Sequence, residues 1–407
     1  MRVYKPSGIE WLGEIPQSWK NVSIRSCFTE SNQRCNTDSY PLLSVTIANG
    51  IIYQDDIENK KDISNDDKSN YKIVPLNAVA YNKMRMWQGA VGVNTLTTGI
   101  VSPAYIVAIP NEKILPNFVS YLFKSKIMIG EFDKNSYGLC LDMNNLRYDD
   151  FRNIKIPLPP LQEQKEIAEF LDKKCEKIQN YINKKQKLIT LLQEKKQALI
   201  NEVVTKGLNP NIEFKNSGIA YLGLIPHHWK VRRMKFMASI HNGREQTEIA
   251  DENGIYPIYG SGGILGKSMY FIYDKPSVLL GRKGTIDKPL FVEEPFWTID
   301  TMFYTSVSKI VLPKYFYYLC LTIDFQFYIS GSAIPSMTQY DLANISFALP
   351  PLQEQKQIAN FLDEKCEKIN SAIEKTKKQI ELVKEYKNTF INEAVCGRIN
   401  LQKKERI

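Results

Sequence analysis

The sequence has no apolar run long enough to cross a membrane and only three histidines among its 407 residues. A membrane-spanning helix needs roughly 20 consecutive, predominantly apolar residues, so a transmembrane segment is not expected. The first residues, Met1–Pro6, also lack the apolar stretch typical of a secretion signal. We therefore predict a cytoplasmic protein without a membrane partner.

The sequence also has few of the residue patterns that mark a reaction centre. Its seven cysteines are scattered, with no Cys-x-x-Cys pair and no histidine at metal-ligand spacing, so neither a disulfide framework nor a zinc site is indicated. No Ser/His/Asp arrangement, Asp-Pro-Pro-Tyr methyltransferase motif or acidic nuclease cluster stands out. The chain is predicted to be non-catalytic by itself, with no metal site and no cofactor of its own.

One stretch, residues 259–268, comes close to a phosphate-binding loop. It reads Tyr-Gly-Ser-Gly-Gly-Ile-Leu-Gly-Lys-Ser, whereas the pattern G-x-x-x-x-G-K-S requires glycine at Ser261. The loop must also open a helix whose N-terminus holds the phosphates. The following residues, Met269–Tyr273, instead have the composition of a strand, so a phosphate-binding loop is not favoured.

Two long segments of the chain repeat each other. The sequence Leu-Pro-Pro-Leu-Gln-Glu-Gln-Lys at 158–165 returns unchanged at 349–356, which is 191 positions later. Further matches continue at this offset as far as Ile-Asn-Glu at 200–202 and 391–393. The two segments are therefore aligned without a gap.

Both repeated segments have helical boundaries. Each starts with a proline pair, which suits the entrance of a helix, and runs to Gly207 or Gly397, which suits a C-cap. No glycine or proline lies between these marks. We predict one long helix within 158–208, and a second long helix with a C-terminal tail within 349–407.

The apolar residues of both segments follow a 3.5-residue period, which is typical of a coiled-coil seam. An amphipathic helix of this length needs a partner, so the two helices are predicted to pair as an antiparallel coiled coil. The alternative is that each helix packs separately on its own neighbouring domain. The predicted seam comprises Leu171, Ile178, Ile182, Ile189 and Leu192 in the first helix and Leu362, Ile369, Ile373, Ile380 and Val383 in the second.

A second repeat lies near the start of each domain, and we call its two copies the tryptophan motifs. Residues 7–20 return in related form as 217–230, at an offset of 210 positions. The motifs are rich in Gly, Pro and Trp, so they are expected to be ordered loops anchored by an aromatic side chain. Trp19 and Trp229 are predicted to pack in the protein interior; stacking on bases is the alternative.

Two mixed α/β domains are predicted for the segments 1–157 and 209–348, each of which contains one tryptophan motif. Both contain short strand-like runs bounded by Gly, Pro and Asn, with a helical stretch late in each, at Asn117–Ile129 and Lys314–Tyr328. The predicted fold class is therefore α+β, with the two domains separated by the two long helices in a pseudo-twofold internal repeat.

The formal net charge of +9 is weak evidence for nucleic-acid binding, because the surplus lies mostly on the helical segments. Two intervals without acidic residues, 68–111 and 275–286, are more specific. Arg with Asn or Gln can read base edges, Lys suits phosphate, and Gly281 and Gly284 are expected to let the backbone approach a phosphate. A solvated basic loop is the alternative. The candidate DNA contacts are Asn82, Lys83, Arg85, Trp87 and Gln88 in the first domain and Arg244, Ser261, Lys267, Arg282 and Lys283 in the second.

With these two duplicated motifs, the chain resembles the specificity subunits of type I restriction-modification systems over essentially its whole length. The resemblance implies that each domain is a target-recognition domain reading one half of a split double-stranded DNA sequence, and that the paired helices act as a ruler. It implies two modification subunits as partners, which use S-adenosylmethionine to methylate adenine N6. It also implies restriction subunits, which cleave DNA with ATP and Mg²⁺.

Two other functions are compatible with parts of the sequence. A coiled-coil scaffold would bind proteins without any DNA specificity. An enzyme with an unrecognised centre, such as a nuclease or a fused methyltransferase, would turn over DNA by itself. The resemblance assigns no base-contacting residues, so the DNA candidates rest on charge and residue type alone.

Overall fold

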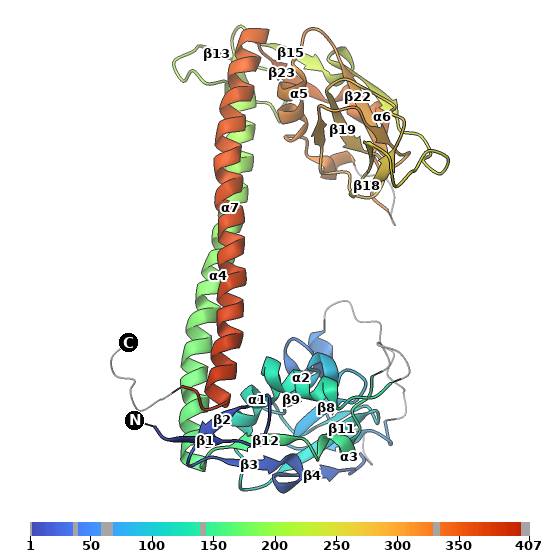
Figure 1. Cartoon of the computed structure of the whole chain (residues 1–407). Helices are drawn as coiled ribbons and strands as arrows, with labels where there is room; N and C mark the ends of the chain where they lie inside the picture. Colours follow the sequence, from blue (N-terminus) through green and yellow to red (C-terminus); the bar gives the residue numbers. More distant parts are fainter. Residues whose placement is uncertain (1, 36–39, 58–67, 139–143, 329–333, 400–407) are drawn as a thin grey trace. The chain divides into compact units, whose positions relative to one another are not determined.

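A computed structural model of the chain describes residues 2–35, 40–57, 68–138, 144–328 and 334–399. It divides into two compact units: unit 1 comprises Met1–Lys184 and Lys378–Ile407, and unit 2 comprises Lys185–Lys377. Each unit contains one β-rich domain and parts of both long helices (Figure 1). The predicted C-terminal tail from residue 400 onward lies outside the described residues.

The domain of unit 1 is built on a four-stranded antiparallel sheet in the order β4-β11-β8-β9. Two helices, α1 (Pro116–Lys124) and α2 (Lys126–Lys134), follow the sheet and bury aromatic side chains such as Phe118 and Phe132 in its core. The sheet strands are β4 (Phe28–Ser31), β8 (Val79–Asn82), β9 (Val91–Val93) and β11 (Tyr105–Pro110). Small antiparallel pairs surround it: β1 (Tyr4–Pro6) with β2 (Glu14–Pro16), β3 (Lys20–Ser23) with β12 (Lys155–Leu158), β5 (Leu43–Thr46) with β6 (Gly50–Tyr53), and β7 (Lys72–Val74) with β10 (Gly99–Val101).

The domain of unit 2 repeats this plan. Its four-stranded sheet has the order β16-β22-β19-β20, so β16, β22, β19 and β20 take the places of β4, β11, β8 and β9. These strands are β16 (Ala238–Asn242), β19 (Ser277–Gly281), β20 (Leu290–Val292) and β22 (Met302–Val307). Two strand pairs accompany this sheet: β13 (Phe214–Asn216) with β14 (Leu224–Pro226), and β15 (Lys230–Arg233) with β23 (Ser346–Leu349). A three-stranded sheet is formed by β17 (Tyr256–Gly260), β18 (Gly263–Ser268) and β21 (Trp297–Thr298). The helices of this domain are α5 (Pro313–Cys320) and α6 (Gln339–Asn344). Unit 1 likewise has a short helix, α3 (Tyr148–Phe151), just before its last strand.

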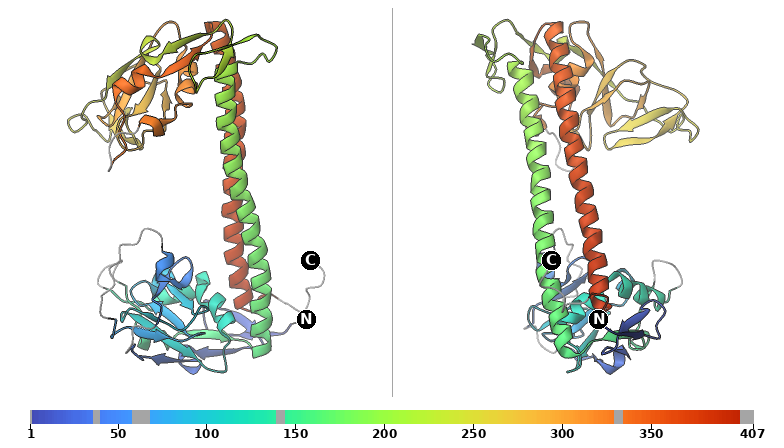
Figure 2. Two further views of the ribbon diagram at one scale, coloured as in Figure 1. Left: turned by 180° about the vertical axis from the view of Figure 1, so that it is seen from behind. Right: turned by 60° about the vertical axis from the view of Figure 1, so that its left-hand side comes forward.

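The two long helices are α4 (Leu161–Lys206) and α7 (Leu352–Val395), and they are in contact (Figure 2). In unit 1 the start of α4 meets the end of α7, where the ring centroids of Phe170 and Phe390 lie 5.3 Å apart. In unit 2 the end of α4 meets the start of α7, where Lys196 Nζ donates to Asn370 Oδ1 over 3.0 Å. The helices therefore run antiparallel, and the α+β prediction with paired long helices is confirmed.

The residues of the predicted seam lie on the shielded side of both helices. Half of them are buried and half are partly buried, while most of the residues between them are exposed. The buried members are Leu171, Ile182, Leu362, Ile373 and Ile380; the partly buried members are Ile178, Ile189, Leu192, Ile369 and Val383. Charged residues interrupt both helices throughout, and no helix in the described parts of the chain carries the uninterrupted apolar run that a bilayer crossing requires.

Three element predictions are wrong. The stretch Lys314–Tyr328 is not one helix, because α5 ends at Cys320 and a separate 3-10 turn spans Phe325–Tyr328. The stretch Asn117–Ile129 is not one helix, because Ser125 ends α1 and caps α2 by accepting a hydrogen bond from the Met128 N–H over 3.3 Å. The stretch Met269–Tyr273 is not a strand. Instead, the strand β18 already spans the Gly-Lys-Ser sequence, as the second arm of a hairpin with β17. No helix follows that hairpin turn, which agrees with rejecting a phosphate-binding loop.

Candidate nucleic-acid interface

The repeated motifs join each domain to its long helix. In unit 1 the Trp19 Nε1–H donates to Glu163 Oε2 over 2.8 Å, and in unit 2 Trp229 Nε1–H donates to Glu354 Oε2 over 3.0 Å. Both indoles are completely buried. The prediction that these tryptophans pack inside the protein is confirmed, and their partner is the glutamate of the Leu-Pro-Pro-Leu-Gln-Glu-Gln-Lys repeat.

The glutamine that follows this glutamate forms a second joint. The buried Gln164 accepts the Leu115 N–H over 2.8 Å, and its amide donates to the carbonyl oxygens of Lys113 (3.0 Å) and Pro159 (2.9 Å). Gln355 makes the same three contacts in unit 2, with Leu312, Ile310 and Pro350. Because a buried amide with all its partners is costly to disrupt, this joint fixes the domain on the helix start.

A third joint comes from the domain helices. The hydroxyl of Tyr121 donates to Asp172 Oδ1 of α4, and Tyr318 donates to Asp363 Oδ1 of α7, both over 2.6 Å. Burial is the main cause that raises the pKa of both phenols, with the carboxylates adding to the effect. Both hydroxyls therefore stay protonated as donors.

Five polar or basic residues gather at one edge of the unit 1 sheet, and we call Arg34, Lys72, Asn82, Lys83 and Arg85 the first basic edge. Asn82 ends β8, opposite Tyr105 at the start of β11, and its side chain hydrogen-bonds the Tyr105 hydroxyl. Lys83 and Arg85 follow in the turn to β9. Arg34 lies beyond the end of β4, where its backbone forms an isolated antiparallel β-bridge with Lys72. Arg34 and Arg85 are exposed and the other three partly exposed.

The first basic edge concentrates positive charge. Burial lowers the pKa of Lys72, and the nearby Lys83 and Arg34 lower it further, while Glu30 opposes them. Such mutual repulsion means that an approaching phosphate would be attracted by several charges at once.

Two predicted contacts of the first domain, Trp87 and Gln88, have polar groups that are hydrogen-bonded or buried within the domain. The Trp87 indole N–H already donates to the Met84 carbonyl oxygen over 3.0 Å, and the side-chain oxygen of Gln88 is buried. The neighbouring Met86 is fully buried in the domain core. Arg85 is exposed, whereas Asn82, Lys83, Trp87 and Gln88 are all partly exposed.

The second domain gathers its candidates at the equivalent edge, and we call Arg244, Ser261, Arg282 and Lys283 the second basic edge. Arg244 follows β16, and Arg282 and Lys283 follow β19. The Arg244 N–H donates to the Thr298 carbonyl (2.8 Å) and the Arg282 N–H to the Thr301 carbonyl (2.8 Å). Ser261, in the turn of the β17–β18 hairpin, also contacts Thr301, where its N–H donates to Thr301 Oγ1 over 3.4 Å.

The structure does not bring Lys267 to this edge. Lys267 pairs with Pro257, at the end of the hairpin remote from the turn that holds Ser261. The role of Gly281 in phosphate approach stays a prediction; within the domain, a side chain there would collide with the Thr285 carbonyl oxygen of its own loop at 2.4 Å. Gly281 therefore permits the close approach of the loop at Thr285 and Ile286. Gly284, with φ +83°, borders Ser261 and remains at the edge.

The two basic edges are anchored alike. The Lys83 carbonyl accepts the Leu146 N–H over 2.8 Å, and the Arg282 carbonyl accepts the Met337 N–H over 3.0 Å. Leu146 and Met337 are separated by the same 191 positions as the helical repeat. Lys83 and Arg282 therefore occupy matching positions in the two domains.

Sequence reasoning selected Arg244 but missed its counterpart Arg34. The two residues are 210 positions apart, the offset of the tryptophan motifs, and an asparagine stands two residues before each, at Asn32 and Asn242. Extending that offset beyond the motif would have found Arg34. Each basic edge thus carries one arginine after the first strand in the order of its sheet (β4 or β16) and basic residues in the turn after the third strand (β8 or β19).

Known proteins that resemble this chain are specificity subunits. The sequence profile of the type I restriction modification DNA specificity domain matches residues 17–193 and 226–382. The type I restriction enzyme MjaVIII specificity subunit of Methanocaldococcus jannaschii is 28% identical over 339 residues, covering 75% of each chain. The putative MjaX specificity subunit of the same organism is 24% identical and covers 96% of each.

Two solved structures share the fold. One is a chain from a structure on the complex assembly and conformational transition of a type I R-M system, with a TM-score of 0.72 and 15% identity, covering 95% of this chain and 99% of that chain. The other is the HsdS subunit from Thermoanaerobacter tengcongensis, with a TM-score of 0.51 and 16% identity, covering 95% and 98%.

Proposed function

The chain belongs to the family of type I restriction-modification DNA specificity subunits, and on this premise we propose that its two basic edges each read one part of a split double-stranded DNA target. Membership confirms the resemblance carried by the repeated motifs. A specificity subunit supplies recognition of the target sequence, while catalysis belongs to other subunits of the complex.

The observation that carries the proposal is the equivalent position of the two edges. Each follows the first and third strands of the same four-stranded sheet, and each turn is anchored by the same backbone hydrogen bond. The residues presented differ between the edges, Asn82, Lys83 and Arg85 against Ser261, Arg282 and Lys283. Similar scaffolds with different side chains suit the reading of two different half-sites.

The side chains suit distinct tasks at the DNA. An arginine fork such as that of Arg85 or Arg282 can donate two hydrogen bonds to guanine O6 and N7, and Asn82 can pair with adenine N6 and N7. Lysines such as Lys83 and Lys283 suit phosphate oxygens, which position the protein without reading sequence. The joints at Trp19 and Trp229 hold each edge at a fixed place on its helix.

The proposal extends to domains and partners. The segments 1–157 and 209–348 would act as reading domains, and 158–208 and 349–407 would contain the spacer helices α4 and α7, of 46 and 44 residues. Two modification subunits would bring S-adenosylmethionine and methylate adenine N6, and restriction subunits would cleave with ATP and Mg²⁺. This chain would hold none of these cofactors and would act in the cytoplasm.

A DNA-binding assay on the reconstituted methyltransferase complex tests the proposal. Arg85→Ala and Arg282→Ala should each weaken binding to the cognate target by about 1–3 kcal/mol and relax the sequence preference. The controls are Arg25→Ala and Lys235→Ala, which change basic residues related by the 210-residue offset and placed before β4 and β16.

Unchanged affinity and unchanged preference in both edge variants would reject this placement of the reading residues. A complex that shows no sequence-selective DNA binding at all would instead favour the scaffold function.

A further inference from the structure

Unit 2 contains a groove of about 490 Å³ where its domain meets the two long helices, and the proposed base reading does not use it. The end of α5 and the loop between β19 and β20 form one side of the groove, and α4 and α7 form the other. Lysines and side-chain amides provide most of its polar lining: Lys196, Lys288, Lys377, Gln193, Gln197 and Asn370.

The charge of this groove suits an anion. Among the lining residues that the structure describes, three lysines stand against a single carboxylate, that of Glu374. Glu374 is already paired with Lys377 over 2.8 Å, and Lys196 Nζ donates to the neutral Asn370 side chain over 3.0 Å. The charges of Lys196 and Lys288 are therefore not neutralised by a carboxylate of the lining.

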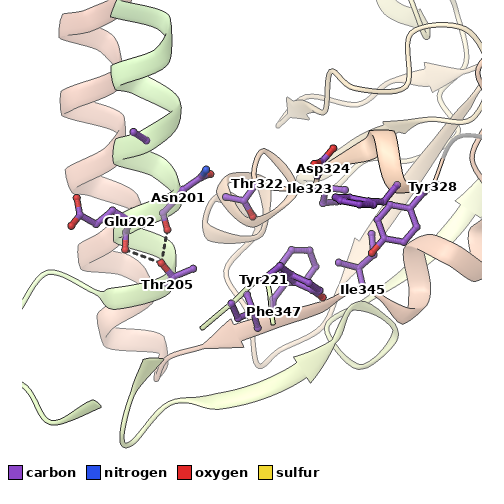
Figure 3. Close-up of a pocket in the computed structure, with 13 residues that line it drawn as sticks. Asn201, Glu202, Thr205, Tyr221, Thr322, Ile323, Asp324, Tyr328, Ile345 and Phe347 are labelled. Atoms are coloured by element: carbon purple, nitrogen blue, oxygen red, sulfur yellow. Dashed lines mark hydrogen bonds between the residues drawn. The ribbon is translucent and has the colours of Figure 1, made fainter. Parts of the chain in front are cut away.

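A second cavity of unit 2 has the opposite charge (Figure 3). It measures about 530 Å³, and Glu202 and Asp324 line it together with aromatic side chains such as Tyr221 and Phe347. None of its lining residues in the described part of the chain is basic. A phosphate would therefore be attracted to the groove and repelled from this cavity.

The internal repeat places a lysine at the same point of both long helices. Lys196 of α4 and Lys387 of α7 are 191 positions apart, and each interrupts the apolar 3.5-residue period of its helix. Burial raises the pKa of the Cys366 thiol on α7, and the nearby Lys196 opposes this shift. The same holds for Cys175 on α4 and Lys387. Because a lysine in a helix seam costs stability, its repetition indicates a role for its charge.

The loop between β19 and β20 connects the groove to the second basic edge. It begins with Arg282 and Lys283, which belong to that edge, and Lys288, which lines the groove, follows five residues after Lys283. Five residues span at most roughly 18 Å when fully extended. Because one turn of B-DNA is about 34 Å long, Lys288 is within about half a helical turn of DNA that is held at this edge.

We propose that the groove binds the sugar-phosphate backbone of the DNA beside the second half-site, with Lys196 and Lys288 donating hydrogen bonds to phosphate oxygens. Lysine ammonium groups suit phosphates, which position a protein on DNA but carry no sequence information. The groove thus adds affinity without adding sequence preference. This inference rests on the proposed function for the position of the DNA, whereas the charge of the groove does not depend on it.

The salt dependence of DNA binding by the reconstituted methyltransferase complex tests the proposal. Affinity is measured over a series of salt concentrations, on DNA that contains the target and on DNA of equal length without it. Lys196→Gln and Lys288→Gln should each reduce the slope of log affinity against log salt concentration by about 0.9 on both DNAs, because each removes one phosphate contact. Lys196→Arg keeps the charge and should retain the wild-type slope. The matched control is Lys195→Gln, which changes an exposed lysine that does not line the groove.

Three outcomes would overturn the proposal. The first is that Lys196→Gln and Lys288→Gln give the same slope as Lys195→Gln. The second is a changed methylation motif in either groove variant, because these lysines would then read bases. The third is weaker association of either groove variant with the purified modification or restriction subunit in the absence of DNA, because the occupant would then be an acidic protein segment. A complex that binds both DNAs equally rejects the reading by the basic edges, whereas the slopes still decide on the groove.

Discussion

At the scale of single residues, Gln164 and Gln355 show how a short repeated motif becomes a structural joint. Each side chain is buried and satisfies three backbone groups of its own domain and helix start. No other side chain of similar size offers both an acceptor and two donors in this geometry. Identity of the motif in both halves is thus explained by identical local contacts.

Replacing this amide tests the joint. Gln164→Leu leaves the Leu115 N–H and two carbonyl oxygens without partners, and it should destabilise unit 1 by about 3 kcal/mol. Gln355→Leu should act equally on unit 2. The measurement is urea-induced unfolding, with the exposed Gln162→Leu as the control, expected to change stability by less than about 0.5 kcal/mol. A loss no larger than that of the control would contradict the role assigned to the joint.

The lowered pKa of Lys72 gives a pH prediction. Burial and the charges of Lys83 and Arg34 lower this pKa in the free protein, and a bound phosphate should raise it again. Binding then takes up a proton, so DNA affinity should fall as pH rises from neutral toward the ordinary lysine pKa of about 10.4. Lys72→Arg should make the affinity nearly independent of pH in this range. An equally steep dependence in that variant would assign the effect to another group.

Contacts between residues that are distant in the sequence could not be predicted from the sequence. The charge pattern located the basic turns at Lys83–Arg85 and Arg282–Lys283, because acid-free intervals are visible without a structure. It could not show that Lys267 lies at the far end of its hairpin, or that the Trp87 indole is already bonded. These facts depend on strand register and on packing between distant segments.

At the scale of elements, both long helices end in a glycine with a left-handed backbone. Gly207 has φ +75° and Gly397 has φ +76°, and each lies against the tryptophan of its unit. A side chain on Gly397 would approach Pro16 to 2.6 Å, and one on Gly207 would approach the Trp229 ring to 3.1 Å. The glycines therefore serve both the helix end and the close packing of the tryptophan motif.

Alanine substitutions at glycines should accordingly differ in sign. Gly397→Ala should destabilise unit 1 by more than about 1 kcal/mol, because it adds both backbone strain and a collision. Gly130→Ala, inside α2 with no atom within 4 Å of the new methyl group, should instead stabilise by about 0.5–1 kcal/mol. Thermal unfolding of the two variants decides it. The same sign for both would refute the explanation.

Long elements were predictable and short ones were less so. The repeat, its proline start and its glycine end locate α4 and α7 to within a few residues, because many turns share one period. The break at Ser125 was not predicted from the sequence. A serine between two apolar stretches can be identified as a helix cap only when the chain is known to change direction there. Met269–Tyr273 has strand-forming residues but follows the end of β18, where pairing stops.

At the scale of the whole molecule, the internal repeat is the feature that connects the sequence to its function. Two domains with the same sheet order are each fixed to a helix start by the same three joints, and each presents a basic edge built from the same strand ends. The joints are repeated closely because they are structural, while the difference between the edges is what the proposed reading of two half-sites requires.

The central claim is that two separate edges read two separate parts of one target. Its most direct test is sequencing of DNA methylation in cells that express this subunit with its modification subunits, as wild type, Arg85→Ala or Arg282→Ala. The wild type should give one discontinuous motif, with degeneracy confined to one half in the first variant and to the other half in the second. A continuous motif, or loss of specificity in the same half for both variants, would contradict it.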